Sequence, residues 1–156
     1  MMAEAAAWAK ENGKSVYEML QDIYVKYGFS KEKGISVVRK GKSGAEEIEA
    51  MMKNFRANPL SEIAGSKVIL IKDFATLKAT DVLAGETFTL DMPTTANVIQ
   101  YFTEDGTKVS IRPSGTEPKI KFYVEVRGTL NSREEYEAIN AKAEDKIKAV
   151  ATSLGV

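Results

Sequence analysis

The segment RPSGTEPK, residues 112–119, holds the side chains in this chain that are best suited to binding chemistry. Arg112 offers a planar pair of donors for two oxygens of a phosphate, and the hydroxyls of Ser114 and Thr116 add further donors. Gly115 lies between them, where it lets the backbone approach an anion closely and lets successive N–H groups converge. The spacing therefore predicts a loop that binds a phosphate group.

Strands are predicted on both sides of this loop. Apolar and polar residues alternate in TKVSIR, residues 107–112, and in KIKFYVEV, residues 119–126, as is typical of strands with one buried face. If the two strands pair, their polar face brings Arg112 together with Lys119 and Lys121. The expected result is a small cationic cup around the loop.

A purely structural role explains the same residues. Pro113 and Pro118 restrict the backbone of the residues before them, so the loop is rigid with or without a ligand. In this alternative the hydroxyls bond local backbone groups, and Arg112 forms an ion pair with Glu117. Clusters of Gly, Ser, Thr and Pro usually mark ordinary loops, so the residues by themselves leave both interpretations open.

The composition excludes several kinds of chemistry. The 156 residues include 22 Lys plus Arg and 22 Asp plus Glu, so no global positive field favours nucleic acid or an anionic membrane. There is no cysteine and no histidine, which removes thiolate metal sites, Cys nucleophiles and the commonest general base. The longest apolar run, KVILI, is far too short to span a membrane, and no signal peptide is evident. We expect a cytoplasmic protein.

The N-terminal third is predicted to be mainly helical. Residues 3–28 form a helical hairpin, because the Ala-rich start favours helix and Ser15 with Glu18 makes a capping box for a second helix. The β-branched run KGISVVRK, residues 33–40, predicts a short strand. Two further capping boxes, Ser43 with Glu46 and Ser132 with Glu135, predict where two later helices begin.

The middle of the chain is predicted to be mainly extended. KVILIKD, residues 67–73, reads as a buried strand, and Asp105-Gly106 supplies the turn of a hairpin over residues 97–112. Residues 74–96 contain possible short strands that the pattern does not assign. The order of elements predicts an α+β fold, with helices on one face of a mainly antiparallel sheet.

The loop and its flanks also carry a resemblance. VSIRPSGTEPKIKFYVEV, residues 109–126, closely resembles the phosphate-binding signature in the C-terminal domain of the α-D-phosphohexomutases. This family includes phosphoglucomutase, phosphomannomutase and phosphoglucosamine mutase, and the extended form is most similar to the phosphoglucomutase branch that also contains phosphopentomutase. Residues 5–29 resemble the final helices of the family's third domain. The resemblance thus covers nearly the whole chain, most strongly residues 97–127.

The resemblance implies a fold, a domain division and a site. The fold is that of the TATA-binding-protein-like C-terminal domain, a four-stranded sheet covered by two helices. Residues 1–29 would be the remnant of the preceding domain, and residues 30–156 the phosphosugar-binding domain. The residues that would hold the substrate's non-reacting phosphate are Arg112, Ser114, Gly115 and Thr116, with Lys121 assisting.

Three family loops have no counterpart in this sequence: the phosphoserine loop, the Asp-rich magnesium loop and the sugar-binding loop. The resemblance therefore implies a fragment without catalytic or metal-binding residues. In the complete enzyme, a magnesium-bound phosphoserine would exchange phosphoryl groups with a sugar 1- or 6-phosphate, and this domain would clamp the other end. Its partners would be the phosphorylated sugar and the missing domains of the same enzyme. The alternative is a non-enzymatic α+β interaction module.

Overall fold

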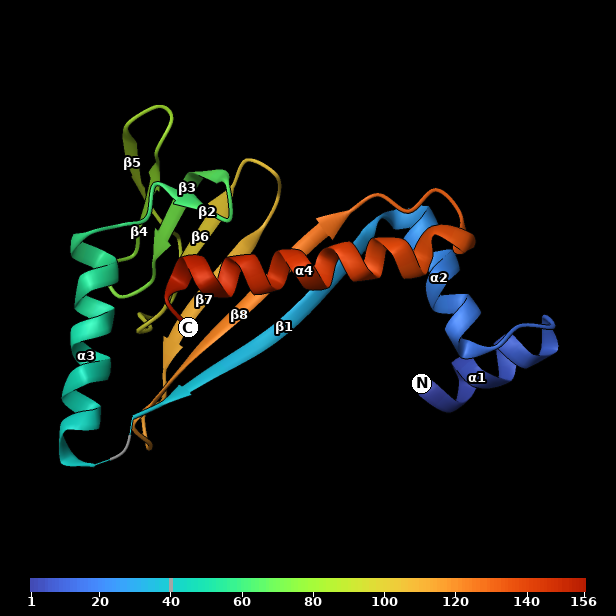
Figure 1. Ribbon diagram of the computed structural model, residues 1–156, viewed down its shortest axis with the longest axis horizontal. Helices are drawn as coiled ribbons and strands as arrows, with labels where there is room; N and C mark the ends of the chain where they lie inside the picture. The colour runs from blue at the N-terminus through green and yellow to red at the C-terminus, as the bar shows by residue number, and fades with distance from the viewer. Residues whose placement is uncertain (40) are drawn as a thin grey trace. The chain divides into compact units, whose positions relative to one another are not determined.

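The architecture comes from a computed structural model that describes residues 1–39 and 41–156. Two compact units are present: one comprises Met1–Lys31 and Arg127–Asp145, the other Glu32–Val126 and Lys146–Val156. Figure 1 labels the elements, which in chain order are α1 (Met2–Glu11), α2 (Val16–Tyr27), β1 (Phe29–Val38), α3 (Lys42–Ala57), β2 (Glu62–Ile63), β3 (Ser66–Asp73), β4 (Lys78–Asp81), β5 (Glu86–Thr89), β6 (Ile99–Thr103), β7 (Lys108–Pro113), β8 (Lys119–Gly128), the 3₁₀ helix η1 (Arg133–Glu135) and α4 (Tyr136–Leu154).

The second unit is built on a sheet with the order β1-β8-β7-β6-β3-β4-β5, and β2 pairs with β3 outside this path. The pairs β3–β4, β3–β6, β4–β5, β6–β7 and β7–β8 are all antiparallel. The predicted α+β fold with a mainly antiparallel sheet is therefore confirmed. The described residues form eight strands, however, where the resemblance implied four.

The additional strands include β4 and β5, which form a hairpin in the segment that the pattern left unassigned. All four residues of β5 are exposed, and only Ala79 of β4 is fully buried. A strand without a buried face carries no apolar alternation, so the sequence indicated no more than possible short strands in this segment.

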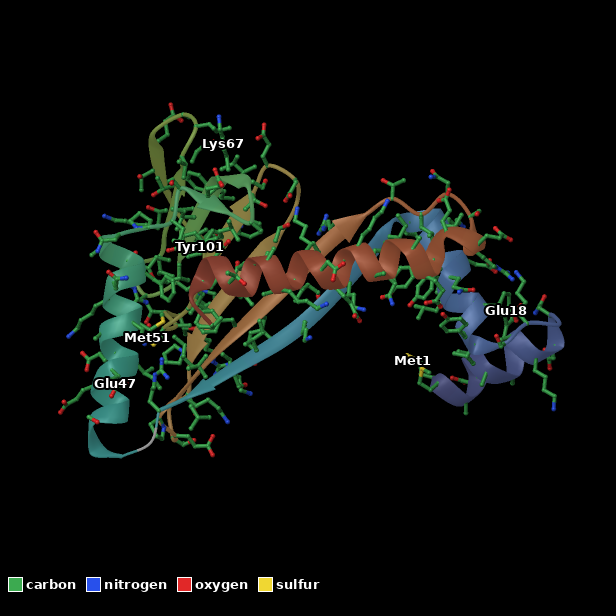
Figure 2. The ribbon with its side chains drawn as sticks, in the orientation of Figure 1. Met1, Glu18, Glu47, Met51, Lys67 and Tyr101 are labelled. Atoms are coloured by element: carbon green, nitrogen blue, oxygen red, sulfur yellow. The ribbon has the colours of Figure 1, made fainter. Side chains whose placement is uncertain are left out.

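One face of the sheet carries the hydrophobic core. Ile111 and Phe122 from neighbouring strands pack in one cluster with Met52 of α3 and with Ile147 of α4. The helix α3 and the C-terminal part of α4 therefore cover the same face, and this part of α4 crosses β7 and β8 in Figure 1. Tyr101, labelled in Figure 2, lies inside this core. Its hydroxyl donates a 2.8 Å hydrogen bond to the Phe55 carbonyl.

The first unit contains the predicted helical hairpin of α1 and α2. The capping box at Ser15 is confirmed: the Ser15 hydroxyl accepts from the Glu18 N–H, and the Glu18 carboxylate accepts from the Ser15 N–H. Asp22 of α2 forms an ion pair with Arg133 of η1, with 2.5 Å between Oδ1 and Nε. Since Tyr24 also packs against a cluster formed by Phe29, Leu130 and Ala143, the hairpin contacts later parts of the chain. The assignment of residues 1–29 to a preceding domain stays a prediction.

The other two predicted capping boxes are wrong. Helix α3 begins at Lys42, with Gly41 as N-cap at φ +91° and no side-chain cap, so Ser43 lies inside the first turn. Ser132 precedes η1 without a capping hydrogen bond. The Glu135 carboxylate accepts from the Asn131 N–H instead, at 3.0 Å. Lys40, the last residue of the predicted strand 33–40, lies outside the described residues.

Along residues 1–39 and 41–156, the structure contains no helix with the length and apolarity needed to cross a membrane.

Candidate functional site

The predicted pairing of the two strands around the loop is present. β7 and β8 pair antiparallel with Arg112 directly opposite Lys121 and Ser110 opposite Tyr123. Because side chains of paired residues project to the same face of a sheet, Arg112 and Lys121 lie together on the face away from α3 and α4. The prediction that the polar residues of these two strands share one face of the sheet is thus correct.

The loop between the strands, residues 114–118, is held at its ends by backbone hydrogen bonds. The Ser114 N–H donates to the Lys119 carbonyl at 2.7 Å, and the Lys119 N–H donates to the Glu117 carbonyl at 2.7 Å. The Arg39 N–H donates to the Pro118 carbonyl at 2.9 Å. The far side of the loop adjoins α3, since Pro113, Ser114, Glu117 and Pro118 line a small hollow together with residues of that helix. The loop is therefore fixed without a ligand.

An open pocket of about 530 Å³ lies at this loop. The structure brings all five predicted site residues together in its lining, which consists of Arg112, Pro113, Ser114, Gly115, Thr116, Glu117, Lys119, Lys121 and Tyr123. Three of these side chains are cationic and one is a carboxylate, which leaves an excess of two positive charges. We call this pocket the phosphate cup.

The ion pair in the cup differs from the one expected in the purely structural alternative, which paired Arg112 with Glu117. Glu117 forms its ion pair with Lys119, with 2.5 Å between Oε2 and Nζ, and not with Arg112. A hydrogen bond from Lys119, the charge of Lys119 and the more distant charge of Lys121 lower the pKa of Glu117. Among the described residues no carboxylate forms an ion pair with Arg112, whose side chain is exposed.

The backbone of the loop differs from the expected nest. Ser114, Gly115 and Thr116 all lack a positive φ, whereas a nest alternates right- and left-handed conformations. The Ser114 N–H is used within the loop, and the Thr116 N–H reaches the Ser114 hydroxyl only at 3.4 Å. A Cβ added to Gly115 would meet nothing within 4 Å. The N–H groups of Gly115 and Thr116 therefore donate no hydrogen bond to another backbone group of the described residues.

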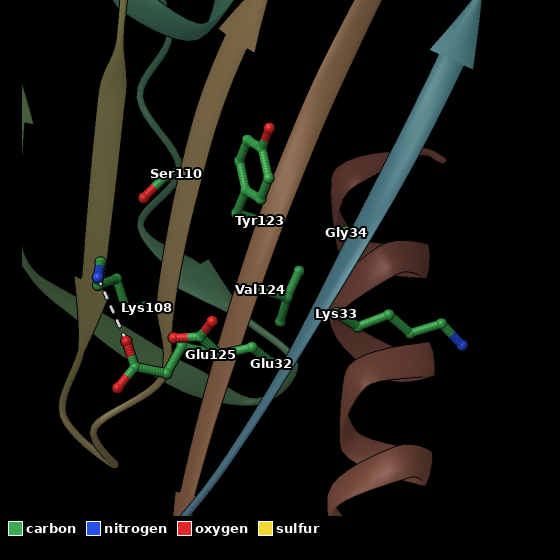
Figure 3. A pocket seen from close by; sticks show the side chains of 8 residues that line it. All are labelled: Glu32, Lys33, Gly34, Lys108, Ser110, Tyr123, Val124 and Glu125. Atoms are coloured by element: carbon green, nitrogen blue, oxygen red, sulfur yellow. Dashed lines mark hydrogen bonds and ion pairs between the residues drawn. The ribbon is translucent and has the colours of Figure 1, made fainter. Parts of the chain in front are cut away.

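Sequence reasoning missed a second hollow on the same sheet face, which Figure 3 shows from close by. Its volume is about 490 Å³, and its lining is Glu32, Lys33, Gly34, Lys108, Ser110, Tyr123, Val124 and Glu125. The signal that could have found it is the same alternation that places Ser110 and Tyr123 on the face of Arg112. Nothing in the sequence indicated that β1 would lie beside β8 and bring Gly34 there.

Fold and site together define a class: an α+β domain whose helices cover one sheet face and whose other face ends in a cationic hairpin loop. A model of the phosphoglucomutase/phosphomannomutase C-terminal domain matches residues 35–143. The chain belongs to this family.

Curated relatives agree with this assignment. The chain is 37% identical over 147 residues to a phosphoglucomutase of Staphylococcus epidermidis, covering 94% of this chain and 26% of the relative. It is 35% identical over 130 residues to a phosphoglucomutase of Staphylococcus saprophyticus, covering 82% of this chain and 23% of the relative. The chain thus spans about a quarter of the length of these relatives.

A solved structure is also similar: the open form of the exocytosis-sensitive phosphoprotein parafusin, a phosphoglucomutase from Paramecium. The identity is 15% and the TM-score 0.38, over 91% of this chain and 24% of that one.

Proposed function

We propose that this chain is the substrate-phosphate-binding domain of a phosphoglucomutase-type enzyme, which interconverts sugar 1-phosphates and 6-phosphates. In this proposal the residues of the phosphate cup hold the phosphate that is not reacting. The family match supports the domain assignment, and the curated relatives named phosphoglucomutase support the reaction.

One observation carries the binding proposal. On the same two strands, Lys108 lies opposite Glu125 as an ordinary ion pair at 3.2 Å, whereas Arg112 lies opposite Lys121. Like charges directly opposite each other destabilise a sheet. A bound anion that contacts both Arg112 and Lys121 would balance their charges and would explain why two cations lie opposite each other.

The charge of the cup suits a phosphate monoester, which carries about −1.5 to −2 at neutral pH. Arg112 would bind two oxygens side by side, Lys121 would act as a point charge, and the loop would supply hydroxyl and N–H donors. Such a clamp transfers no proton. It contributes by positioning, which lowers the barrier of a phosphoryl transfer because the reacting groups no longer have to find their geometry.

The catalytic steps are assigned to residues outside this chain. Across residues 1–39 and 41–156, no three Asp or Glu side chains lie close enough together to hold a metal ion. We expect Mg²⁺ to bind elsewhere in the full-length enzyme, and we expect this chain alone to show no mutase activity. Measurable conversion of glucose 1-phosphate by the purified chain would contradict this assignment.

An NMR titration of the ¹⁵N-labelled chain with glucose 6-phosphate tests the binding proposal directly. The amides of Gly115 and Thr116 should shift, with an affinity near millimolar. Charge-assisted hydrogen bonds contribute roughly 1.5–3 kcal/mol each, against association costs of at least about 4 kcal/mol. Glucose without phosphate is the control and should leave both amides unshifted. If both signals stay in place at high glucose 6-phosphate, the phosphate cup does not bind this ligand.

The alternative, a non-enzymatic interaction module, is not favoured, because the family model covers most of the chain.

A further inference from the structure

The second hollow on the open sheet face adjoins the phosphate cup. Tyr123 lines both, so the two cavities meet at this side chain. We call the second hollow the ring groove; its lining residues are given above. It has no role in the function proposed so far.

Three cross-strand pairs on β7 and β8 lead from the cup into the groove. Arg112 with Lys121 comes first, Ser110 with Tyr123 is next, and Lys108 with Glu125 is last. Residues two apart on a strand are separated by about 6.5–7 Å. The middle pair therefore lies about one sugar ring away from a phosphate held by the first pair.

The positive charge of the cup does not continue along this path. The cup has an excess of two positive side chains. In the ring groove Lys108 forms an ion pair with Glu125 and Glu32 points to the same side, whereas Lys33 points away in Figure 3, so the groove has no positive excess. The two cavities together fit a ligand with one dianionic end and an uncharged, hydrogen-bonding body.

Tyr123 offers the aromatic surface that such a body needs. Its side chain is 46% exposed. Gly34 of β1 lies beside it, and a Cβ there would come only to 3.9 Å from ring atom Cδ1, so the glycine leaves that side of the ring uncovered. In Figure 3 the Tyr123 hydroxyl points away from the Lys108–Glu125 pair. The hydroxyl is thus directed toward the Arg112–Lys121 end of the strands.

Ser110 supplies a hydroxyl at the level of this ring. Its oxygen accepts from Gln100 Nε2 at 3.1 Å, which leaves the hydroxyl proton to donate to a ligand. The Lys108–Glu125 pair, drawn as a dashed line in Figure 3, presents donors and acceptors at the far end.

From this placement we propose that the ring groove holds the hydroxylated ring of the phosphorylated ligand, with Tyr123 as its platform and Ser110 as a hydrogen-bond partner. The proposal rests on the proposed function, since it takes the phosphate cup as the anchor. It assigns to this domain a contact with the sugar itself, in addition to the contact with its phosphate.

Three ligands separate the groove from the cup: methyl phosphate, glucose 6-phosphate and glucose. Methyl phosphate fills only the cup, so glucose 6-phosphate should bind the native chain about fivefold to tenfold more tightly, because it also covers part of the Tyr123 ring. Tyr123→Ala should abolish this difference between the two phosphates, because the variant loses the aromatic platform that only glucose 6-phosphate reaches. Tyr123→Phe keeps the platform and should retain most of the difference.

Tyr27→Ala serves as the matched control, since Tyr27 lies on α2 and is 73% exposed. It should change neither affinity. A second readout on the native chain is the intermolecular NOE between the ring protons of Tyr123 and the sugar protons, which does not depend on any variant folding correctly.

Failure of the groove and failure of the cup look different in these measurements. Equal affinities for methyl phosphate and glucose 6-phosphate, or no NOE from Tyr123 at saturation, would overturn the ring groove and leave the cup intact. Equal losses for both phosphates in Tyr123→Ala would also overturn it, because the tyrosine would then act on the cup. If methyl phosphate does not bind, the proposed function fails and the groove with it.

Discussion

Replacement of Arg112 by Ala should separate binding from stability, because no carboxylate among the described residues forms an ion pair with this side chain. Arg112 is exposed, lies opposite Lys121, and has no carboxylate partner among the described residues. Two unit charges about 8 Å apart in water repel by about 0.5 kcal/mol. Arg112→Ala should therefore leave the free energy of unfolding unchanged or raise it by up to about 0.5 kcal/mol at low salt.

The effect on phosphate binding should be much larger and of opposite sign. The guanidinium is expected to make two charge-assisted hydrogen bonds to the anion, and solvent access reduces what each contributes. A loss of about 2–3 kcal/mol corresponds to a weakening of roughly 30- to 150-fold. Starting from an affinity near millimolar, no saturation should be measurable. Arg112→Lys keeps the charge but lacks the planar pair of donors. Its affinity for phosphate should therefore lie between those of the native chain and Arg112→Ala.

Urea unfolding at about 0.01 M and about 0.15 M salt, together with the NMR titration, measures both effects. The small gain in stability should disappear at the higher salt, where the screening length is about 8 Å. Arg127→Ala removes an exposed arginine at the other end of β8 and should not affect phosphate binding. The reasoning is refuted if Arg112→Ala lowers the free energy of unfolding by more than about 1 kcal/mol while glucose 6-phosphate still binds, since Arg112 would then be a structural residue.

Three further predictions follow from other contacts. Gly115→Ala should leave the unfolding temperature nearly unchanged, because the added Cβ meets nothing within 4 Å and φ is not positive, yet weaken glucose 6-phosphate binding by crowding the anion; an unchanged titration would contradict a close approach at this residue. Tyr101→Phe should cost about 1–2 kcal/mol in urea unfolding, because it removes the hydrogen bond to the Phe55 carbonyl. Burial raises the pKa of Tyr101 from 10.0 to about 12, so its contribution to stability is complete below pH 10 and is lost as the pH rises through 12; the Phe variant should lack this alkaline loss. Hydrogen bonds from Arg133 and then Lys14 lower the pKa of Asp22 from 3.8 to about 2, so its contribution is present above pH 3.8 and is lost as the pH falls through 2; thermal unfolding of Asp22→Asn should differ from that of the native chain at neutral pH and converge with it in acid.

The sequence predicts the strands of the site well because they obey a simple rule. In β7 and β8 the apolar residues Val109, Ile111, Ile120, Phe122, Val124 and Val126 alternate with polar residues and are all buried, so the alternation determines which side chains share the open face. The Asp105-Gly106 turn then fixes β6 beside β7, with Gly106 at φ +81° as such a turn requires. Pairing across short connections needs no information from distant parts of the chain. The grouping of the site residues around one pocket follows from it.

The helix starts were harder to predict because several groups compete for the same backbone donors. The motif Ser-x-x-Glu occurs at Ser15, Ser43 and Ser132, and only the first forms a capping box. At Ser43 the helix begins earlier, after the turn at Gly41. Gly44 packs closely against the backbone of Arg39, because an added Cβ would lie 2.2 Å from the Arg39 carbonyl oxygen. Such a contact depends on the path of the preceding strand, which the local motif does not contain.

The length of the loop explains how a hairpin can hold both a rigid frame and open donors. A two-residue turn would join β7 and β8 directly, and its N–H and C=O groups would be used in closing the strands. In the five-residue loop 114–118, some residues close the strands and others keep their N–H groups available for a ligand. Ser114 and Lys119 close the ladder, and the Arg39 N–H fixes the Pro118 carbonyl. The backbone hydrogen bonds that hold the loop therefore involve only N–H groups at its ends. The N–H groups of Gly115 and Thr116 can bind an anion without breaking a strong internal hydrogen bond.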